Sequence, residues 1–308
     1  MAEVMSMHTL REKKQWLRFF SRFNVAYLFS IPAILLMLAL LIGPVVMVAL
    51  MSLTDYSLGD AGFSWVGFAN YIEMQEDEIF SAAIRNTFIY IIIVIPGSVL
   101  LGLIVAILIE GLSIGKAWWR AIYFLPVMST LIAMAVVWEF MMNARFGMVS
   151  QIVQWFGIES KNWLQQPDTA LPVLCAIAVW QAIGFNMVLF MAGLTAIPKE
   201  LHHAAEMDGA RSAWQRFRLV TWPLLTPVTL FVSIITAIRS FQIFDTVHVL
   251  TQGGPDNASM VLVYQIYQEG FEFFRSSYAA ALTMVFLFFV FILTLIKFYS
   301  AEKSVHYQ

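Results

Sequence analysis

The sequence has 308 residues, of which 60% are hydrophobic and only 12% are charged. A soluble domain of this size carries about twice that charged fraction, so the composition excludes an ordinary soluble globular protein. The net charge of -2 decides little, and the sequence has no basic patch with interleaved aromatic residues, which argues against a nucleic-acid partner. Cys175 is the only cysteine in the sequence, which excludes an internal disulfide.

Six long, charge-poor stretches account for this composition. A helix needs about 20 apolar residues to cross the hydrocarbon core of a bilayer, and each stretch is long enough. Their length differs from the short alternating segments of a membrane barrel. We therefore predict an all-α polytopic membrane protein with about six transmembrane helices in one domain at 23–300. The predicted spans lie near residues 25–51, 83–109, 120–142, 170–196, 223–250 and 277–298.

The distribution of charge predicts how this domain is oriented. Residues 1–22 form a basic, amphipathic segment that suits the headgroup region, and residues 301–308 form a short tail. Thirteen lysines and arginines lie near the termini and in alternate loops, against four in the remaining loops. The positive-inside rule then places both termini in the cytoplasm. The first apolar run is too long for a signal-peptide core and is interpreted as a retained helix.

The segment 198–222, between the fourth and fifth predicted spans, is more than a connector. Pro198 suits a first helical position, good helix formers follow it, and Asp208-Gly209 ends the helix where glycine can adopt a positive φ. Ser212 and Gln215 have capping-box spacing, which predicts a second short helix. A helix–turn–helix of this kind either docks onto a cytoplasmic partner or lies on the membrane surface, and the residue pattern alone leaves both interpretations open.

The same segment resembles the coupling loop of ABC importer permeases. The family pattern is Glu-Ala-Ala, two residues, Asp-Gly-Ala, and then a spaced phenylalanine, an aliphatic residue and two prolines. The sequence matches this pattern with His203-Ala-Ala-Glu-Met-Asp-Gly-Ala210, Phe217, Val220, Pro223 and Pro227. His203 stands where the family usually has glutamate, which removes an anionic partner from the loop. The residues that the resemblance assigns to coupling are His203, Ala204, Ala205, Glu206, Asp208, Gly209, Ala210 and Phe217.

A second run of motifs is similar to the carbohydrate-uptake branch of this family, the maltose and glycerol-phosphate type. It consists of Phe244-Asp245, Val249-Leu250-Thr251-Gln252-Gly253-Gly254-Pro255, Tyr264, Tyr267, Phe271 and Tyr278-Ala279-Ala280.

The resemblance implies the partners and the setting of the chain. It implies a heterodimer with a second permease, two ATP-binding subunits and an extracytoplasmic solute-binding protein, in the lipid of a bacterial inner membrane. It also implies that the partner subunits bind ATP and magnesium, so that this chain is not an enzyme and holds no cofactor. Consistent with this, the sequence contains no Gly-rich Lys-Ser/Thr phosphate-binding motif.

Polar residues inside the predicted spans are the candidates for the solute path, because intramembrane polar residues are functional by default. In the fourth span, Trp180 can stack on a sugar ring or pack in the interior, and Gln181 and Asn186 are further candidates. In the fifth span, Arg239 suits a pore lining or an intersubunit ion pair. Asp245 lies off the polar face, as a structural partner or a snorkelling carboxylate. That polar face collects Thr229, Thr236, Arg239, Ser240, Gln242 and Thr246. The seven candidates for the solute path are Trp180, Gln181, Asn186, Thr236, Arg239, Gln242 and Thr246.

Two other classes of function compete with an ATP-driven permease. An ATP-independent secondary transporter or channel would leave the docking loop without a purpose. An intramembrane enzyme would need a polar catalytic cluster, but the adjacent His202 and His203 cannot share one helical face and have no third ligand nearby, so we predict no metal site. The solute stays open among neutral sugars, polyols, a glycerol phosphate and a sulfonated sugar.

Overall fold

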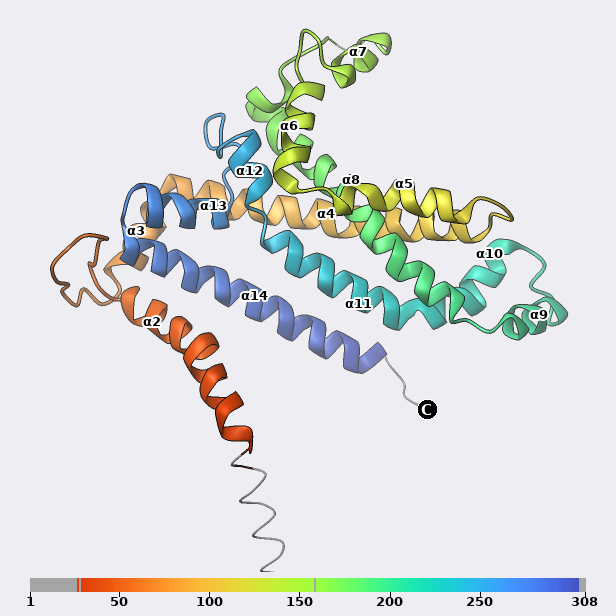
Figure 1. Ribbon diagram of the computed structural model, residues 1–308, viewed down its shortest axis with the longest axis horizontal. Helices are drawn as coiled ribbons and strands as arrows, with labels where there is room; N and C mark the ends of the chain where they lie inside the picture. Colours follow the sequence, from red (N-terminus) through yellow and green to blue (C-terminus); the bar gives the residue numbers. More distant parts are fainter. Residues whose placement is uncertain (1–26, 28, 158, 305–308) are drawn as a thin grey trace, which may run out of the picture.

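The computed structural model describes residues 27, 29–157 and 159–304, without the side chains of Leu131 and of residues 296–304 (Figure 1). The predicted amphipathic segment at 1–22 lies outside the described residues. Regular structure in the described chain is helical, apart from an isolated antiparallel bridge between Thr54 and Trp65. The elements are η1 (Leu38–Ile42), α2 (Gly43–Met51), α3 (Ala69–Glu76), α4 (Glu78–Glu110), α5 (Lys116–Met128), α6 (Leu131–Met141), α7 (Met148–Trp155), η2 (Trp163–Gln165), α8 (Pro167–Thr195), α9 (Lys199–Met207), α10 (Ala213–Arg216), η3 (Phe217–Thr221), α11 (Trp222–Phe241), α12 (Asp245–Leu250), α13 (Leu262–Tyr267), η4 (Gln268–Glu272) and α14 (Ser276–Ser304).

Five helical segments of the described chain are long and apolar enough to cross a membrane, and a bent pair of helices adds a sixth candidate. The pair consists of α5 and α6, which are inclined to each other by 102°. Both α4 and α8 end on the side of the bundle that carries α9, so the chain must return to the opposite side between them through α5 and α6 (Figure 1). The prediction of an all-α protein with about six spans is confirmed. The five single segments are Phe29–Met51, Glu78–Glu110, Pro167–Thr195, Ala213–Phe241 and Ser276–Leu295.

Three of the predicted spans differ from the helices that form. The prediction that residues 120–142 form one helix is wrong, because Ser129 and Thr130 are extended and the Thr130 hydroxyl caps the start of α6. The span at 223–250 is also wrong as one helix, since α11 ends at Phe241 and α12 begins at Asp245. The last helix instead runs further than the predicted 277–298, because no glycine or proline interrupts it before Ser304.

Two buried apolar clusters hold α4 and α8 together, and these two helices pack against each other along most of their length. One cluster includes Tyr90 of α4 and Leu174 of α8, together with residues of α12 and α13. The other joins Leu103 of α4 and Phe190 of α8 to Val232 of α11. The stretch of α8 between the two clusters is therefore fixed at both ends, although its own side chains are more polar.

A close approach between α4 and α8 occurs at Gly102. A Cβ atom on Gly102 would lie 2.7 Å from the Cβ of Asn186 and 3.3 Å from the backbone nitrogen of Met187. Such distances leave no room for a methyl group, so glycine is what allows α8 to lie against α4 here. The contact also places Asn186 in the interior, where only 1% of its surface is exposed.

The first span stands apart from this packed core. None of the most apolar window of Phe29–Met51 is buried inside the chain, whereas about a third of the corresponding windows of α4 and α8 is buried. Figure 1 shows α2 diverging from α4 and α8 on the far side of α14. The helix therefore presents its apolar side chains outward, to lipid or to another subunit.

The Gly102 contact predicts a contrast between two glycines of α4. Gly102→Ala should lower the stability of the folded chain by about 1–3 kcal/mol, because the methyl group overpacks against Asn186 and the α8 backbone. Gly97→Ala should be neutral or slightly stabilising, since its methyl group meets only the side chain of Val179 at 3.3 Å and alanine favours helix. The thermal unfolding midpoint in detergent measures both variants, and equal midpoints would show that the contact at Gly102 can relax.

Candidate functional site

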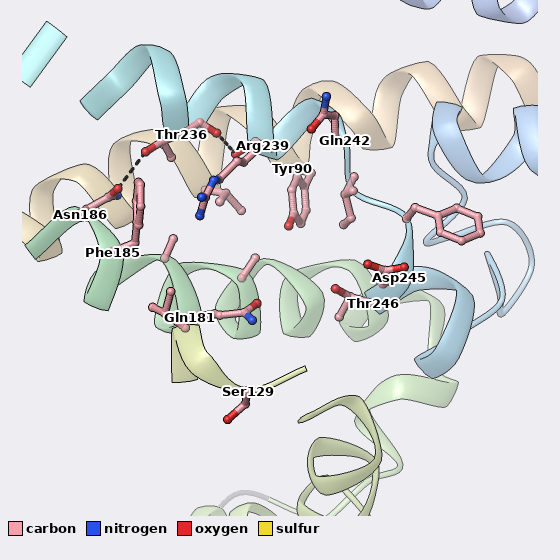
Figure 2. A pocket seen from close by; sticks show the side chains of 17 residues that line it. Tyr90, Ser129, Gln181, Phe185, Asn186, Thr236, Arg239, Gln242, Asp245 and Thr246 are labelled. Atoms are coloured by element: carbon pink, nitrogen blue, oxygen red, sulfur yellow. Dashed lines mark hydrogen bonds between the residues drawn. The ribbon is translucent and has the colours of Figure 1, made fainter. Parts of the chain in front are cut away.

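A cavity of about 490 Å³ opens between α4, α8 and α11, in the stretch of α8 that separates the two apolar clusters (Figure 2). Its size falls within the range of about 300–1,000 Å³ that is typical of small-molecule sites. Its wall combines aromatic rings, hydroxyl groups, amides and two charged side chains. Six of the seven residues predicted for the solute path line it: Gln181, Asn186, Thr236, Arg239, Gln242 and Thr246.

Trp180 is the predicted residue that the structure leaves out of the cavity. Its indole packs edge-on against the indole of Trp138, with ring centroids 5.3 Å apart and an interplanar angle of 83°. It borders a separate, apolar groove between α4 and α8 instead. Of the two roles open to this residue on sequence alone, the contact with Trp138 supports packing.

The break after α11 changes how the C-terminal part of the wall is built. Gln242 leaves the helical conformation, with φ of -88° and ψ of +22°, and the chain turns before α12 begins. Gln242 and Thr246 therefore reach the cavity from a turn and a separate short helix, not from one continuous helical face. Asp245, which the helical wheel places off that face, lines the cavity beside Thr246. The buried side chains of Ile243 and Val247 anchor this irregular segment in the core.

Asn186 and Thr236 form the deepest polar contact of the cavity. The Thr236 hydroxyl donates a 3.0 Å hydrogen bond to Oδ1 of Asn186 and so joins α11 to α8. The Nδ2 atom of Asn186 is buried and has no hydrogen-bond partner among the described residues. A buried amide with unused donors is costly, so this group is expected to meet an acceptor that enters the cavity.

Arg239 lies one turn beyond Thr236 on α11. Its guanidinium carbon is 4.0 Å from the ring centroid of Phe185, which is a cation–π arrangement. No ion pair with a carboxylate is found for Arg239 among the described residues. The flat face of the guanidinium is thus occupied, and its N–H edges are available to a ligand or to a partner subunit.

Several lining residues were not among the sequence candidates. Tyr90, Phe185 and Phe244 supply aromatic surface, and Ser129 supplies a hydroxyl from the bend between α5 and α6. An aromatic residue inside an apolar span resembles a core residue, so the sequence offers no signal that separates Phe185 from its neighbours. Ser129 is recognisable only once the bend is known.

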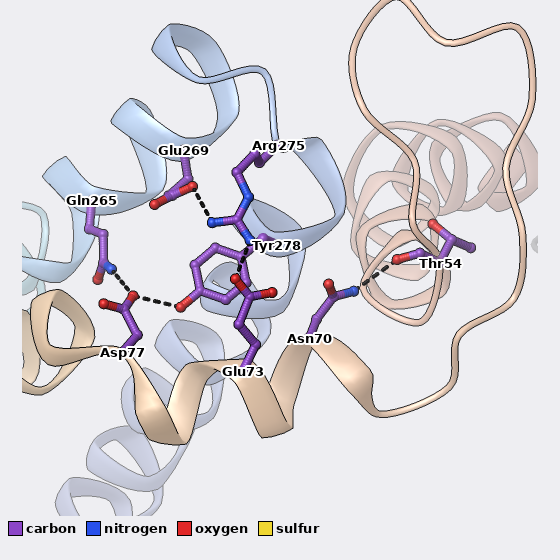
Figure 3. Close-up of polar contacts among 8 residues, drawn as sticks. All are labelled: Thr54, Asn70, Glu73, Asp77, Gln265, Glu269, Arg275 and Tyr278. Carbon is purple, nitrogen blue, oxygen red and sulfur yellow. Dashed lines mark hydrogen bonds and ion pairs between the residues drawn. The ribbon is translucent and has the colours of Figure 1, made fainter.

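A second polar cluster lies at the end of the bundle that is opposite to α9 (Figure 3). Arg275 forms ion pairs with Glu73 and with Glu269, the latter at 3.2 Å. Asp77, at the start of α4, accepts hydrogen bonds from Gln265 at 3.0 Å and from the Tyr278 hydroxyl at 2.7 Å. We call these six residues the outer polar cluster. It fastens α3 and the start of α4 to η4 and the start of α14.

Glu269 is the buried carboxylate of the outer polar cluster, with 6% of its surface exposed. Burial raises the pKa of its carboxyl group, and the nearby Arg275 lowers that pKa only in part. The ionised carboxylate is therefore held in place at a net electrostatic cost.

The segment 198–222 folds as the sequence predicts, with one small difference. Pro198 is the residue before α9 and not its first helical residue. Gly209 has φ of +95°, and the capping box between Ser212 and Gln215 is present at the start of α10. An ion pair of 3.1 Å between Glu206 and Arg216 ties the two short helices together.

The surface of this loop combines charged and aromatic groups. The rings of Trp214 and Phe217 stack with centroids 5.5 Å apart, while Met207 and Trp214 are 88% and 68% exposed. His203 lies 3.9 Å from the carboxylate of Glu206. Ala210 is buried, whereas the other residues that the resemblance assigns to coupling are exposed or half-buried. The loop projects beyond α8 and α11 at one end of the bundle, where it can contact a partner (Figure 1).

A helical membrane domain with an internal polar cavity and a projecting helical loop is the architecture of a transport permease. The family described as "Binding-protein-dependent transport system inner membrane component" matches residues 80–303. A probable ABC transporter permease protein of Pyrococcus horikoshii is 31% identical over 279 residues, which cover 90% of this chain and 95% of that protein. The lactose transport system permease protein of Rhizobium radiobacter is also 31% identical, over 90% of this chain and 94% of that protein.

A solved bacterial ABC transporter involved in the import of the acidic polysaccharide alginate has the same fold. Its matching chain superposes with a TM-score of 0.78 at 21% identity, over 94% of this chain and 99% of that chain. The family match and the two relatives together identify the chain. It belongs to the inner-membrane permeases of binding-protein-dependent ABC transport systems, and it is a multi-pass membrane protein.

The raised pKa of Glu269 predicts a pH-dependent stability. A glutamate whose pKa is raised on folding contributes stability that is full below its usual pKa of 4.5 and is lost as the pH rises through the raised value. Glu269→Gln removes this loss, so the unfolding midpoint of the variant should rise relative to wild type between pH 4.5 and neutrality. The matched control is Glu76→Gln on α3, which removes an exposed carboxylate. Parallel pH curves for wild type and Glu269→Gln would contradict the assignment.

Proposed function

We propose that the chain is one of two permease subunits that form the path of a sugar-like solute through the membrane. In this proposal a second, different permease completes the path, and two cytoplasmic subunits bind and hydrolyse ATP with magnesium. An extracytoplasmic binding protein delivers the solute, and both termini of the chain face the cytoplasm. The carbohydrate class rests on the motifs from Phe244 to Ala280, and the lactose permease relative supports it.

One observation carries the proposal. The segment 198–222 joins α8 to α11, and these are the two helices that wall the cavity beside Asn186, Thr236 and Arg239. A force on the loop is therefore transmitted along both helices to the cavity without an intervening flexible linker. The loop itself is braced by the Glu206–Arg216 ion pair and the Ser212 capping box. A partner that moves the loop would thus change the shape of the solute site.

The composition of the cavity suits a polyol. Sugar hydroxyl groups need both donors and acceptors, which the amides, hydroxyl groups and charged side chains supply. Tyr90, Phe185 and Phe244 add apolar faces on which a sugar ring can pack. A site of this kind holds its solute by many weak contacts, which is compatible with release on the other side of the membrane.

The proposed function predicts that the chain alone transports nothing. Reconstituted by itself in liposomes, it should take up none of the probes lactose, glucose and glucuronate, with or without ATP. The complete assembly with its second permease, ATP-binding subunits and binding protein should show ATP-dependent uptake of its solute. ATP-independent uptake by the chain alone would instead establish a secondary transporter or channel.

The geometry of the loop predicts an uncoupled variant. A Cβ atom on Gly209 would meet nothing within 4 Å, so a substitution there acts only through its positive φ. Gly209→Val should strain the turn by about 1–3 kcal/mol and lower solute uptake per ATP hydrolysed in the complete assembly. Gly209→Asn is the matched control, because asparagine tolerates positive φ. Unchanged coupling in the valine variant would show that the turn does not transmit the force.

A further inference from the structure

We propose that the cavity selects an anionic sugar-like solute, whose acid group binds the guanidinium of Arg239 and the amide Nδ2 of Asn186. The proposal rests on the proposed function, since it concerns the same cavity. The acid group is an oxyanion such as a carboxylate, phosphate or sulfonate, and the rest of the solute is a polyol. The two binding groups come from different helices, Arg239 from α11 and Asn186 from α8, and the hydroxyl of Thr236 joins these helices between them.

The orientation of Asn186 makes it a hydrogen-bond donor to the cavity. Its Oδ1 atom already accepts the hydroxyl of Thr236, so the NH2 group is what remains for a ligand. The side chain is almost fully buried, and its Cβ atom lies against Gly102 of α4. Its burial and the hydrogen bond from the Thr236 hydroxyl hold the amide in this orientation. Its unpartnered Nδ2 atom therefore marks the position of a ligand acceptor atom.

Arg239 supplies the positive charge at the same end of the cavity. Figure 2 shows Arg239, Thr236, Phe185 and Asn186 grouped together, with the guanidinium directed into the open space. Stacking on Phe185 fixes the plane of the guanidinium and leaves its N–H groups at the edge unpaired with any carboxylate of the described chain. A planar pair of N–H donors matches two oxygens of one acid group. Arg239 and Asn186 thus form a donor end that accepts oxyanions.

Asp245 does not neutralise this donor end. It lines the same cavity, but Figure 2 places it with Thr246 at the opposite end, and no ion pair joins it to Arg239. Asp245 is exposed and begins the short helix α12, whose first N–H groups favour a carboxylate. It is therefore an acceptor for hydroxyl groups of the solute. A neutral sugar would satisfy Asp245 but would leave the N–H groups of Arg239, which is exposed to the cavity, without an acid group to bind.

Matched acidic and neutral probes test the proposal on the assembled complex of both permeases and the ATP-binding subunits. The binding protein is left out, so that its own selectivity does not decide the result. The pairs are glucuronate with glucose, glycerol 3-phosphate with glycerol, and 6-deoxy-6-sulfoglucose with glucose. The shift of the unfolding midpoint with probe concentration gives each apparent affinity. At least one acid should bind about 10- to 100-fold tighter than its neutral partner, the effect of a charged hydrogen-bonded pair.

Three variants assign the effect to the two residues. Arg239→Gln should abolish the preference for the acid, and Arg239→Lys should keep a weaker preference, because the charge remains and the planar fork is lost. Asn186→Asp should also abolish acid binding, because it places a carboxylate where the solute anion would lie. Thr229→Ala is the control, since among the described residues the Thr229 hydroxyl bonds to the carbonyl of Leu225 in its own helix, and Thr229 is not among the residues that line the cavity. This control should bind the acid as wild type does.

The outcomes separate this inference from the proposed function. Equal binding of acids and neutral partners by wild type, no binding of any acid, or an acid preference that survives in Arg239→Gln would overturn the inference. Arg239 could instead pair with a carboxylate of the second permease, and a lower complex yield in Arg239→Gln together with no acid preference in wild type would then be observed. ATP-driven uptake of a neutral sugar would also overturn the inference while leaving the proposed function intact.

Discussion

The contact of α4 with α8 at Gly102 is the constraint on which the solute site depends. Because glycine lets the two helices meet there, Asn186 is driven into the interior, and its amide must find partners within the domain. The Thr236 hydroxyl donates a hydrogen bond to Oδ1 of that amide and thereby fixes α11 relative to α8. Arg239 then projects into the space left between these helices. A single close approach thus sets both the width of the cavity and the groups that face it.

The same two helices, α8 and α11, connect the cavity to the loop at 198–222. This loop contains two short helices, of which α10 begins with a capping box, a glycine turn with positive φ and an ion pair between Glu206 and Arg216. Its stiffness matters because a flexible loop would absorb a displacement instead of passing it to α8 and α11. At the other end of the bundle, the outer polar cluster fastens α3 and α4 to η4 and α14. The cavity lies between the loop at 198–222 and the outer polar cluster.

In the outer polar cluster, away from the solute cavity, burial shifts the pKa of a carboxyl group. Glu269 is held next to Arg275 in a buried position that raises its pKa, and Asp77 is bound by Gln265 and the Tyr278 hydroxyl. The acidic residues of this region are visible in the sequence as a negatively charged loop. The partners of Glu73 and Asp77 come from residues about 200 positions further along the chain, so only the folded protein assigns these two carboxylates a role.

The sequence by itself determined the membrane class, the approximate number of spans, the loop with its Gly209 turn and Ser212 cap, and six of the residues around the cavity. These features depend on apolar length and local hydrogen bonding, which neighbouring residues decide. Only the tertiary structure decided that Trp180 packs on Trp138, that the helix breaks after Phe241, and that Asp245 faces the cavity. No glycine or proline marks that break. It follows from the burial of Ile243 and Val247 among residues distant in sequence, which a local pattern cannot show.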